Sequence, residues 1–190
     1  MNKYFTLSLL VSAIIFCGCD NKKTSAAADS DSTAVTSTIP DTAYYGTVGE
    51  GTTMHLLVLN TEDGKKLEFE YNNLADNEES SSEVQGGIFE GDRITLTAHK
   101  SADSEALVVT KAVNITTLLG KWTSLARNFT IKEEGVVESS GAVESNPYTQ
   151  WTMTNAQLVL NTDTFDVLQL GADSISLENA KGIFVYKRGK

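Results

Sequence analysis

Short apolar runs, separated at regular intervals by turn-forming residues, constrain the fold of this chain more than any other feature. The runs are rich in Val, Ile, Thr and Tyr, and Gly, Asn or Asp falls between them, whereas the chain holds only two prolines. β-Branched and aromatic residues suit strands, and short runs bounded by turn residues are typical of them. The pattern predicts an all-β protein.

The first folded segment extends from Tyr44 to Ile115 and has five predicted strands. Between the second and third, Glu62-Asp63-Gly64 indicates a hairpin, because glycine accepts the positive φ that a tight turn requires. A long polar insert, Asn72 to Gln85, separates the third strand from the fourth. The five predicted strands are Tyr45 to Val48, His55 to Thr61, Lys66 to Tyr71, Arg93 to His99 and Ala106 to Val113.

Five strands with such an insert resemble the OB-fold, a small Greek-key barrel that often enters its fourth strand through a Gly-Asp turn. Gly91-Asp92 before Arg93 matches that turn. The resemblance implies an OB-like β domain at residues 42–116. The insert itself is acidic, and a solvated loop or short helix is favoured over a calcium site, because its spacing is not that of an EF-hand.

The second segment begins at Leu118 and holds about eight short runs in an even series, which starts at Trp122. This spacing predicts an up-and-down meander, which avoids exposed sheet edges by closing into a barrel. The later runs are Phe129 to Lys132, Val136 to Ser140, Tyr148 to Thr154, Gln157 to Asn161, Phe165 to Leu170, Ser174 to Glu178 and Ile183 to Lys187.

Gly120-Lys121-Trp122, the meander, and the closing Tyr186-Lys187-Arg188 resemble lipocalin-like domains of envelope lipoproteins. The resemblance implies a lipocalin-like barrel at residues 117–190. It also implies that Gly120, Trp122 and Arg188 close one barrel end, with Arg188 over the indole and Lys187 as the alternative cation. The short strands favour an interior filled by aromatic side chains over a cavity for one small ligand.

The N-terminus has the order of a secretory signal peptide: Lys3, an apolar core from Tyr4 to Phe16, and then Gly18 and Cys19. The core is too short to span a bilayer. The segment resembles a lipobox, although Phe16 stands where that motif usually has Leu. We therefore expect residues 1–18 to be cleaved and Cys19 to carry acyl chains such as palmitate, with Cys17 as the competing site.

From its polar composition we expect residues 19–41 to be a disordered linker. The resemblance implies a lipid-anchored protein in the cell envelope of a Gram-negative bacterium, with the outer membrane as the expected address. Inner-membrane location is the alternative, because Asp20 directly after the cysteine resembles the inner-membrane retention signal of enteric bacteria. That retention rule does not hold in all Gram-negative groups.

Composition limits the functions of the folded part. With 25 acidic against 15 basic residues the chain has a net charge of −10, which disfavours nucleic acid as a partner. The sequence has no recognisable catalytic motif and no metal-ligand pattern; His55 and His99 are expected to be structural. We expect a binding or interaction module without cofactor or enzymatic activity, for a small molecule, a glycan or an envelope protein. A structural accessory subunit of an envelope assembly is the alternative.

Overall fold

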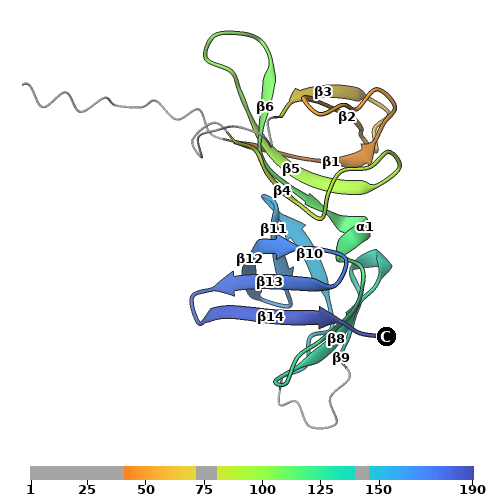
Figure 1. Ribbon diagram of the computed structural model, residues 1–190, viewed down its shortest axis with the longest axis vertical. Helices are drawn as coiled ribbons and strands as arrows, with labels where there is room; N and C mark the ends of the chain where they lie inside the picture. Colours follow the sequence, from red (N-terminus) through yellow and green to blue (C-terminus); the bar gives the residue numbers. More distant parts are fainter. Residues whose placement is uncertain (1–40, 72–80, 140–145) are drawn as a thin grey trace, which may run out of the picture. The chain divides into compact units, whose positions relative to one another are not determined.

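The computed structural model describes residues 41–71, 81–139 and 146–190, and the regular secondary structure of these residues is almost entirely β-strand (Figure 1). A small closed barrel of five strands comes first, and a nearly closed antiparallel barrel of eight strands follows it. The predicted all-β fold class is confirmed, and the two barrels are compatible with OB-like and lipocalin-like domains. The predicted domain boundaries stay a prediction.

The first barrel has Greek-key order. Its strands are β1 (Thr42–Val48), β2 (Leu56–Asn60), β3 (Lys66–Glu70), β5 (Arg93–Lys100) and β6 (Leu107–Asn114). They lie in the order β3-β2-β1-β5-β6, and a parallel pairing of β3 with β6, at Phe69–Leu107 and Glu70–Val108, closes the barrel. All five strands overlap the ranges predicted from the sequence.

Turn chemistry positions these strands. Gly64 has a φ of 79° in the turn between β2 and β3, and Gly91-Asp92 leads into β5 with the Gly91 N–H donating to the carbonyl of Val48 at 2.9 Å. Alternate residues of each strand then point inward. The resulting core includes Val48, Leu57, Leu59, Phe69, Ile94, Leu96, Ala98, Val109 and Ala112, all nearly inaccessible to solvent.

Two elements differ from the sequence prediction. Glu83 and its neighbours form a short strand, β4 (Glu83–Gln85), parallel to β6, where the sequence indicated a loop or helix. The long strand β6 offers a free edge there, so three residues can pair despite weak local preference. The short helix α1 (Ile115–Leu118) was also not predicted; the Asn114 side chain caps it by accepting from the Thr117 N–H at 2.9 Å.

Asn114 is 1% exposed and joins several segments. Besides capping α1, its amide nitrogen donates to the Gly87 carbonyl at 3.1 Å and to the Asp92 carboxylate at 2.6 Å. Gly86, with a φ of 89°, packs so closely that a Cβ there would lie 2.8 Å from the Asn114 Cβ. Asn114 therefore connects the end of β6, the segment after β4 and the entry to β5.

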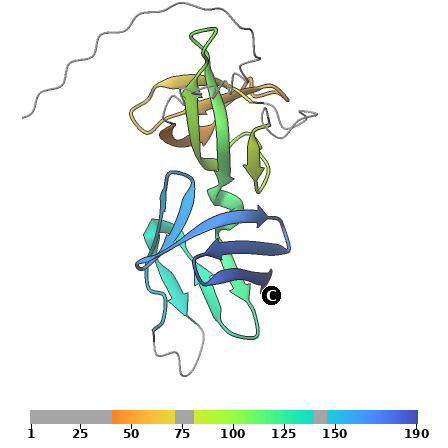
Figure 2. The same ribbon diagram turned by 90° about the vertical axis from the view of Figure 1, so that its left-hand side faces the viewer.

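The second barrel is an up-and-down meander (Figure 1). Its strands are β7 (Gly120–Thr123), β8 (Asn128–Ile131), β9 (Val137–Ser139), β10 (Trp151–Thr154), β11 (Gln157–Leu160), β12 (Asp163–Leu170), β13 (Ser174–Asn179) and β14 (Gly182–Arg188). β14 pairs back to β7, and the single bridge Val136–Gln150 joins the β9 and β10 ends. In Figure 2 the last strands, in dark blue, lie side by side and end at the C-terminus.

β10 begins three residues later than the predicted Tyr148 to Thr154. Before it, the Asn161 side chain accepts hydrogen bonds from the backbone N–H groups of Thr149, at 2.9 Å, and Gln150, at 3.2 Å. A side chain thus pairs these two N–H groups, while the carbonyls of Thr149 and Gln150 accept from the backbone N–H groups of Val137 and Asn161.

Candidate functional site

Aromatic side chains fill the interior of the second barrel. Phe129 lies edge-to-face against Tyr186 and Tyr148, with ring centroids 5.0 and 5.7 Å apart. Phe165 extends the series, at 6.4 Å from Tyr148 and 5.9 Å from Phe184. Edge-to-face contacts at these separations are attractive. The interior is thus packed by side chains, and a binding site on this barrel would have to lie on its outer surface.

The structure brings the predicted residues Gly120, Trp122 and Arg188 together at one barrel end. Trp122 is fully buried, and its indole Nε1 donates to the Leu118 carbonyl at 2.9 Å. The Arg188 guanidinium lies over the indole at 3.9 Å from the ring centroid, within the range of a cation–π contact. Lys187, the alternative cation, instead lies on the exposed face, where its residue pairs with Thr123.

Arg188 also holds the chain around it. Its Nη1 donates to the Leu119 carbonyl and its Nη2 to the Thr117 carbonyl, both at 2.6 Å. Partial burial lowers the pKa of this guanidinium below its ordinary value, and the nearby Asp173 carboxylate opposes that shift. Gly120 makes room for it, because a Cβ there would lie 2.6 Å from Nη1. Gly120, Trp122 and Arg188 therefore connect α1 with β7 and β14, the first and last strands of the barrel.

A surface groove that could serve as a binding site lies beside this end. A groove of about 620 Å³ runs between the turn at residues 123–126 and β14 at residues 183–187. Three large apolar side chains on or beside it face solvent: Ile183 is 60% exposed, Val185 is 58% exposed and Leu125 is fully exposed. Isolated exposed apolar residues are ordinary, but neighbouring ones along a groove indicate an interaction site.

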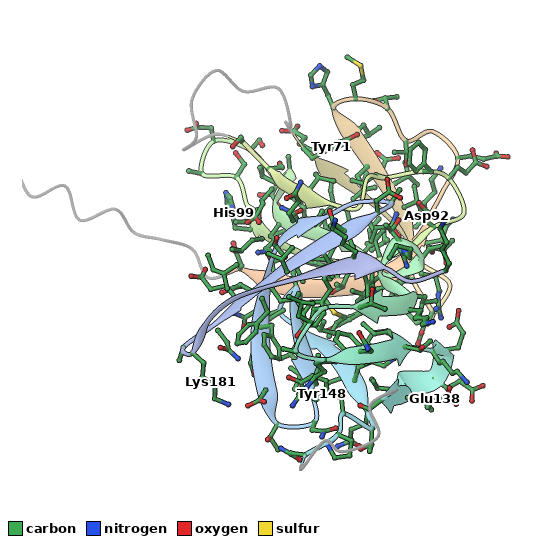
Figure 3. The ribbon with its side chains drawn as sticks, turned by 60° about the horizontal axis from the view of Figure 1, so that its bottom comes forward. Tyr71, Asp92, His99, Glu138, Tyr148 and Lys181 are labelled. Atoms are coloured by element: carbon green, nitrogen blue, oxygen red, sulfur yellow. The ribbon has the colours of Figure 1, made fainter. Side chains whose placement is uncertain are left out.

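Unequal strand lengths create the groove. β7 pairs with β14 only at Thr123–Lys187 and Trp122–Arg188, and then the chain turns away. The Ser124 hydroxyl stabilises that turn by donating to the Arg127 carbonyl at 3.0 Å and accepting from the Arg127 N–H at 3.1 Å. β14 continues back to Gly182 beyond this point. Figure 3 labels Lys181 in the turn where β14 begins.

This groove was not predicted from the sequence, although the sequence carries a signal for it. Residues Ile183, Phe184, Val185 and Tyr186 are consecutively apolar or aromatic. A strand with one face in a barrel core and one in water should alternate apolar with polar residues. Because Phe184 and Tyr186 face the core, Ile183 and Val185 must point outward, which is the observed exposure.

The first barrel has a smaller hollow of about 450 Å³, near its β3–β6 closure. His55 and Glu70 line it beside Tyr71, whose hydroxyl donates to the Thr53 carbonyl at 2.7 Å. His99 lies elsewhere, with Nδ1 at 3.4 Å from an Asp41 carboxylate oxygen. The hollow has fewer exposed apolar side chains than the groove.

Trp151, the first residue of β10, is partly buried. Its ring packs against the core of the second barrel, and its Nε1 donates to the Lys132 carbonyl at 2.6 Å. Trp151 is therefore mainly a packing residue.

Other sequence predictions lie partly or wholly outside the described residues. Cys19, the predicted lipidation site, is one of them, as are the acids of residues 72–80. Within the described ranges, no group of three or more His, Cys, Asp or Glu side chains is arranged to hold a metal ion. Helices of the described part are also too short to cross a bilayer.

Comparisons with protein-family models, with curated proteins and with solved structures found no match to this chain.

Proposed function

We propose that this protein is a lipid-anchored binding module of the Gram-negative cell envelope. The leader supports the anchor: a lysine, a short apolar core and Gly18-Cys19 follow the order of a lipoprotein signal. Acyl chains on Cys19 would supply the lipid signals that stable anchoring requires. The barrels would then act at the membrane surface.

The groove of the second barrel carries the binding part of this proposal. It joins exposed aliphatic side chains, Leu125, Ile183 and Val185, to a strand edge that lacks a partner over most of its length within the described chain. Burial of apolar area would supply the affinity, at about 25 cal/mol per Å² before the cost of association. The groove lies at the surface, so a partner can reach it without opening the packed barrel.

The residues that line the groove favour binding over catalysis. Aliphatic and aromatic side chains dominate the lining, and the Ser124 hydroxyl is engaged with Arg127 in its own turn. We therefore propose binding rather than catalysis.

Metabolic labelling tests the anchor. We expect labelled palmitate to be incorporated into the wild-type protein and lost from Cys19→Ala, which should leave the membrane fraction. Label that survives Cys19→Ala and disappears in Cys17→Ala would move the anchor to the other cysteine. Label on neither would remove the lipid anchor from the proposal.

Site-specific photo-crosslinking in intact cells tests the groove. A photoreactive residue at Leu125 should give a discrete adduct that Ile183→Lys abolishes. Phe89 is the matched control, since it is 71% exposed and apolar but lies on the first barrel. Equal adducts from both positions, or none from Leu125, would contradict a binding groove.

A further inference from the structure

The overhanging part of β14 has an unpaired edge. On one side, every residue from Gly182 to Lys187 pairs with β13. On the other, the pairing with β7 covers only Lys187 and Arg188. Residues 182–186 thus have no strand partner on this side among the described residues.

The backbone groups that face this edge belong to Ile183 and Val185. The Thr123 hydroxyl donates to the Lys187 carbonyl at 3.2 Å, so Lys187 faces β7, whereas the Arg188 N–H donates away from it to Asp173 at 2.7 Å. Successive residues of a strand alternate in this direction. Ile183 and Val185 share the orientation of Lys187, so their N–H and C=O groups point into the groove.

The two-residue turn between β13 and β14 gives the same assignment independently. Its closing pair is Asn179–Gly182, and the closing pair of such a turn exchanges hydrogen bonds across the hairpin. Gly182, Phe184 and Tyr186 therefore bond to β13. Ile183 and Val185, which alternate with them, therefore face the open edge.

Positive charge lies at the Lys187 end of the groove, in a protein that is acidic as a whole. Lys187 lines it, and among the described residues this ammonium has no ion-pair partner. Lys121 lies two residues before Thr123 on the exposed face of β7, and its Nζ donates to the Lys190 carbonyl at 3.2 Å, which brings the C-terminal lysine alongside. A partner with carboxylates suits this end of the barrel, although the chain has a net charge of −10.

We propose that the open edge of β14 binds an extended, acidic polypeptide segment as an added strand. This inference rests on the proposed function and names the partner chemistry of the same groove. Main-chain hydrogen bonds would supply affinity, and alternate side chains would supply specificity. An anionic bilayer would match the lysines, but its hydrocarbon cannot pair the N–H and C=O groups of Ile183 and Val185.

The edge defines the segment. Residues 183–186 extend over about 13 Å at about 3.3 Å per residue, so roughly four residues of a partner can pair. Side chains of the added strand on the outer face would lie against Ile183 and Val185 and should be apolar. A carboxylate at the end near Lys187 would add an opposite-charge cross-strand contact.

The binding test uses the purified full chain and a fluorescent, capped peptide of alternating Val and Thr with Glu at both ends. Fluorescence anisotropy should show saturable binding with a dissociation constant below about 1 mM. The same peptide with Lys in place of Glu should bind more weakly. Val185→Pro should weaken binding about tenfold, because it removes an edge N–H without removing a bond to β13. Lys187→Glu should weaken it about fivefold, and the control Lys66→Glu, on β3, should leave it unchanged.

Amide hydrogen exchange on the wild-type protein supplies a readout that needs no variant. In the free chain, Phe184 and Tyr186 should exchange slowly and Ile183 and Val185 fast. Saturating Glu-ended peptide should slow Ile183 and Val185 specifically.

Several results would overturn the inference. The inference is wrong if the dissociation constant of the Glu-ended peptide exceeds about 1 mM or if both peptides bind equally. It is also wrong if the peptide leaves the amides of residues 183 and 185 unprotected. A dimer in sedimentation that Val185→Pro abolishes would assign the edge to a second copy instead. If the Leu125 adduct persists in cells while the peptide results fail, the proposed function stands and only the added strand falls.

Discussion

Removing the Arg188 side chain should destabilise the second barrel strongly, even though the residue is third from the C-terminus. Its guanidinium makes three hydrogen bonds to carbonyls, at 2.6, 2.6 and 3.0 Å, and lies over Trp122. Charge-assisted bonds contribute about 1.5–3 kcal/mol each when buried, but this site is partly open to water. We take about 1 kcal/mol for each bond and about 1 kcal/mol for the cation–π contact.

Water will reach some of the freed carbonyls, so we expect Arg188→Met to cost about 3 kcal/mol of unfolding free energy. With a urea slope of about 2 kcal/mol per molar, the midpoint should fall by roughly 1.5 M. Arg188→Lys should lose about half as much, because an ammonium keeps the charge but not the planar fork. Urea titration followed by Trp fluorescence and by circular dichroism measures both shifts.

Lys187→Met is the matched control, since it removes a neighbouring cation from the exposed face. This substitution should lower the free energy of unfolding by no more than about 0.5 kcal/mol. If Arg188→Met also costs less than about 0.5 kcal/mol, or if the two substitutions cost the same, the assignment of Arg188 as the fastening residue of this barrel end is wrong.

Three further predictions concern the first barrel. Gly86→Ala should cost about 2 kcal/mol more than Gly91→Ala in thermal unfolding, because both residues have positive φ but a Cβ would clash only at Gly86; equal costs would refute the crowding. Asn114→Ala should cost about 2–4 kcal/mol in urea, since it removes a helix cap and leaves buried polar groups unpaired; a cost below about 1 kcal/mol would contradict this role. Hydrogen bonding from the Lys65 ammonium lowers the pKa of Asp63 to about 2, so the stabilisation from this pair is present above the ordinary aspartate value and lost as pH falls towards about 2. Carboxyl NMR titration should show this midpoint, and Lys65→Met should raise it; an unchanged midpoint would remove Lys65 as the cause.

Local chemistry explains why so many strands could be predicted. Each turn signal, such as Glu62-Asp63-Gly64 or Gly91-Asp92, lies at the end of a strand in the structure. Turn residues act through their own φ and short hydrogen bonds, and alternation acts through one strand, so both can be interpreted without knowing the partner strands.

Elements that depend on distant partners could not be predicted in this way. β4 has only three residues and pairs with β6, about 28 positions away in the register Glu83–Lys111. α1 begins where Asn114 finds the partners Gly87 and Asp92. The contact that stabilises β4 lies outside any local window of sequence, and at α1 the local cap from Asn114 to Thr117 depends on an asparagine that Gly87 and Asp92 hold in place.

The candidate site also combines features that depend on local sequence with features that depend on distant strands. The all-β class and most strands could be predicted from turn residues and alternation, and a resemblance in a short motif implied the pairing of Trp122 with Arg188. That β7 stops pairing at Thr123 while β14 extends back to Gly182 became visible in the folded barrel alone. An open edge is a difference in length between two strands whose nearest ends, Thr123 and Gly182, lie 59 residues apart along the chain, and such a difference exists only once the barrel has closed and set their register.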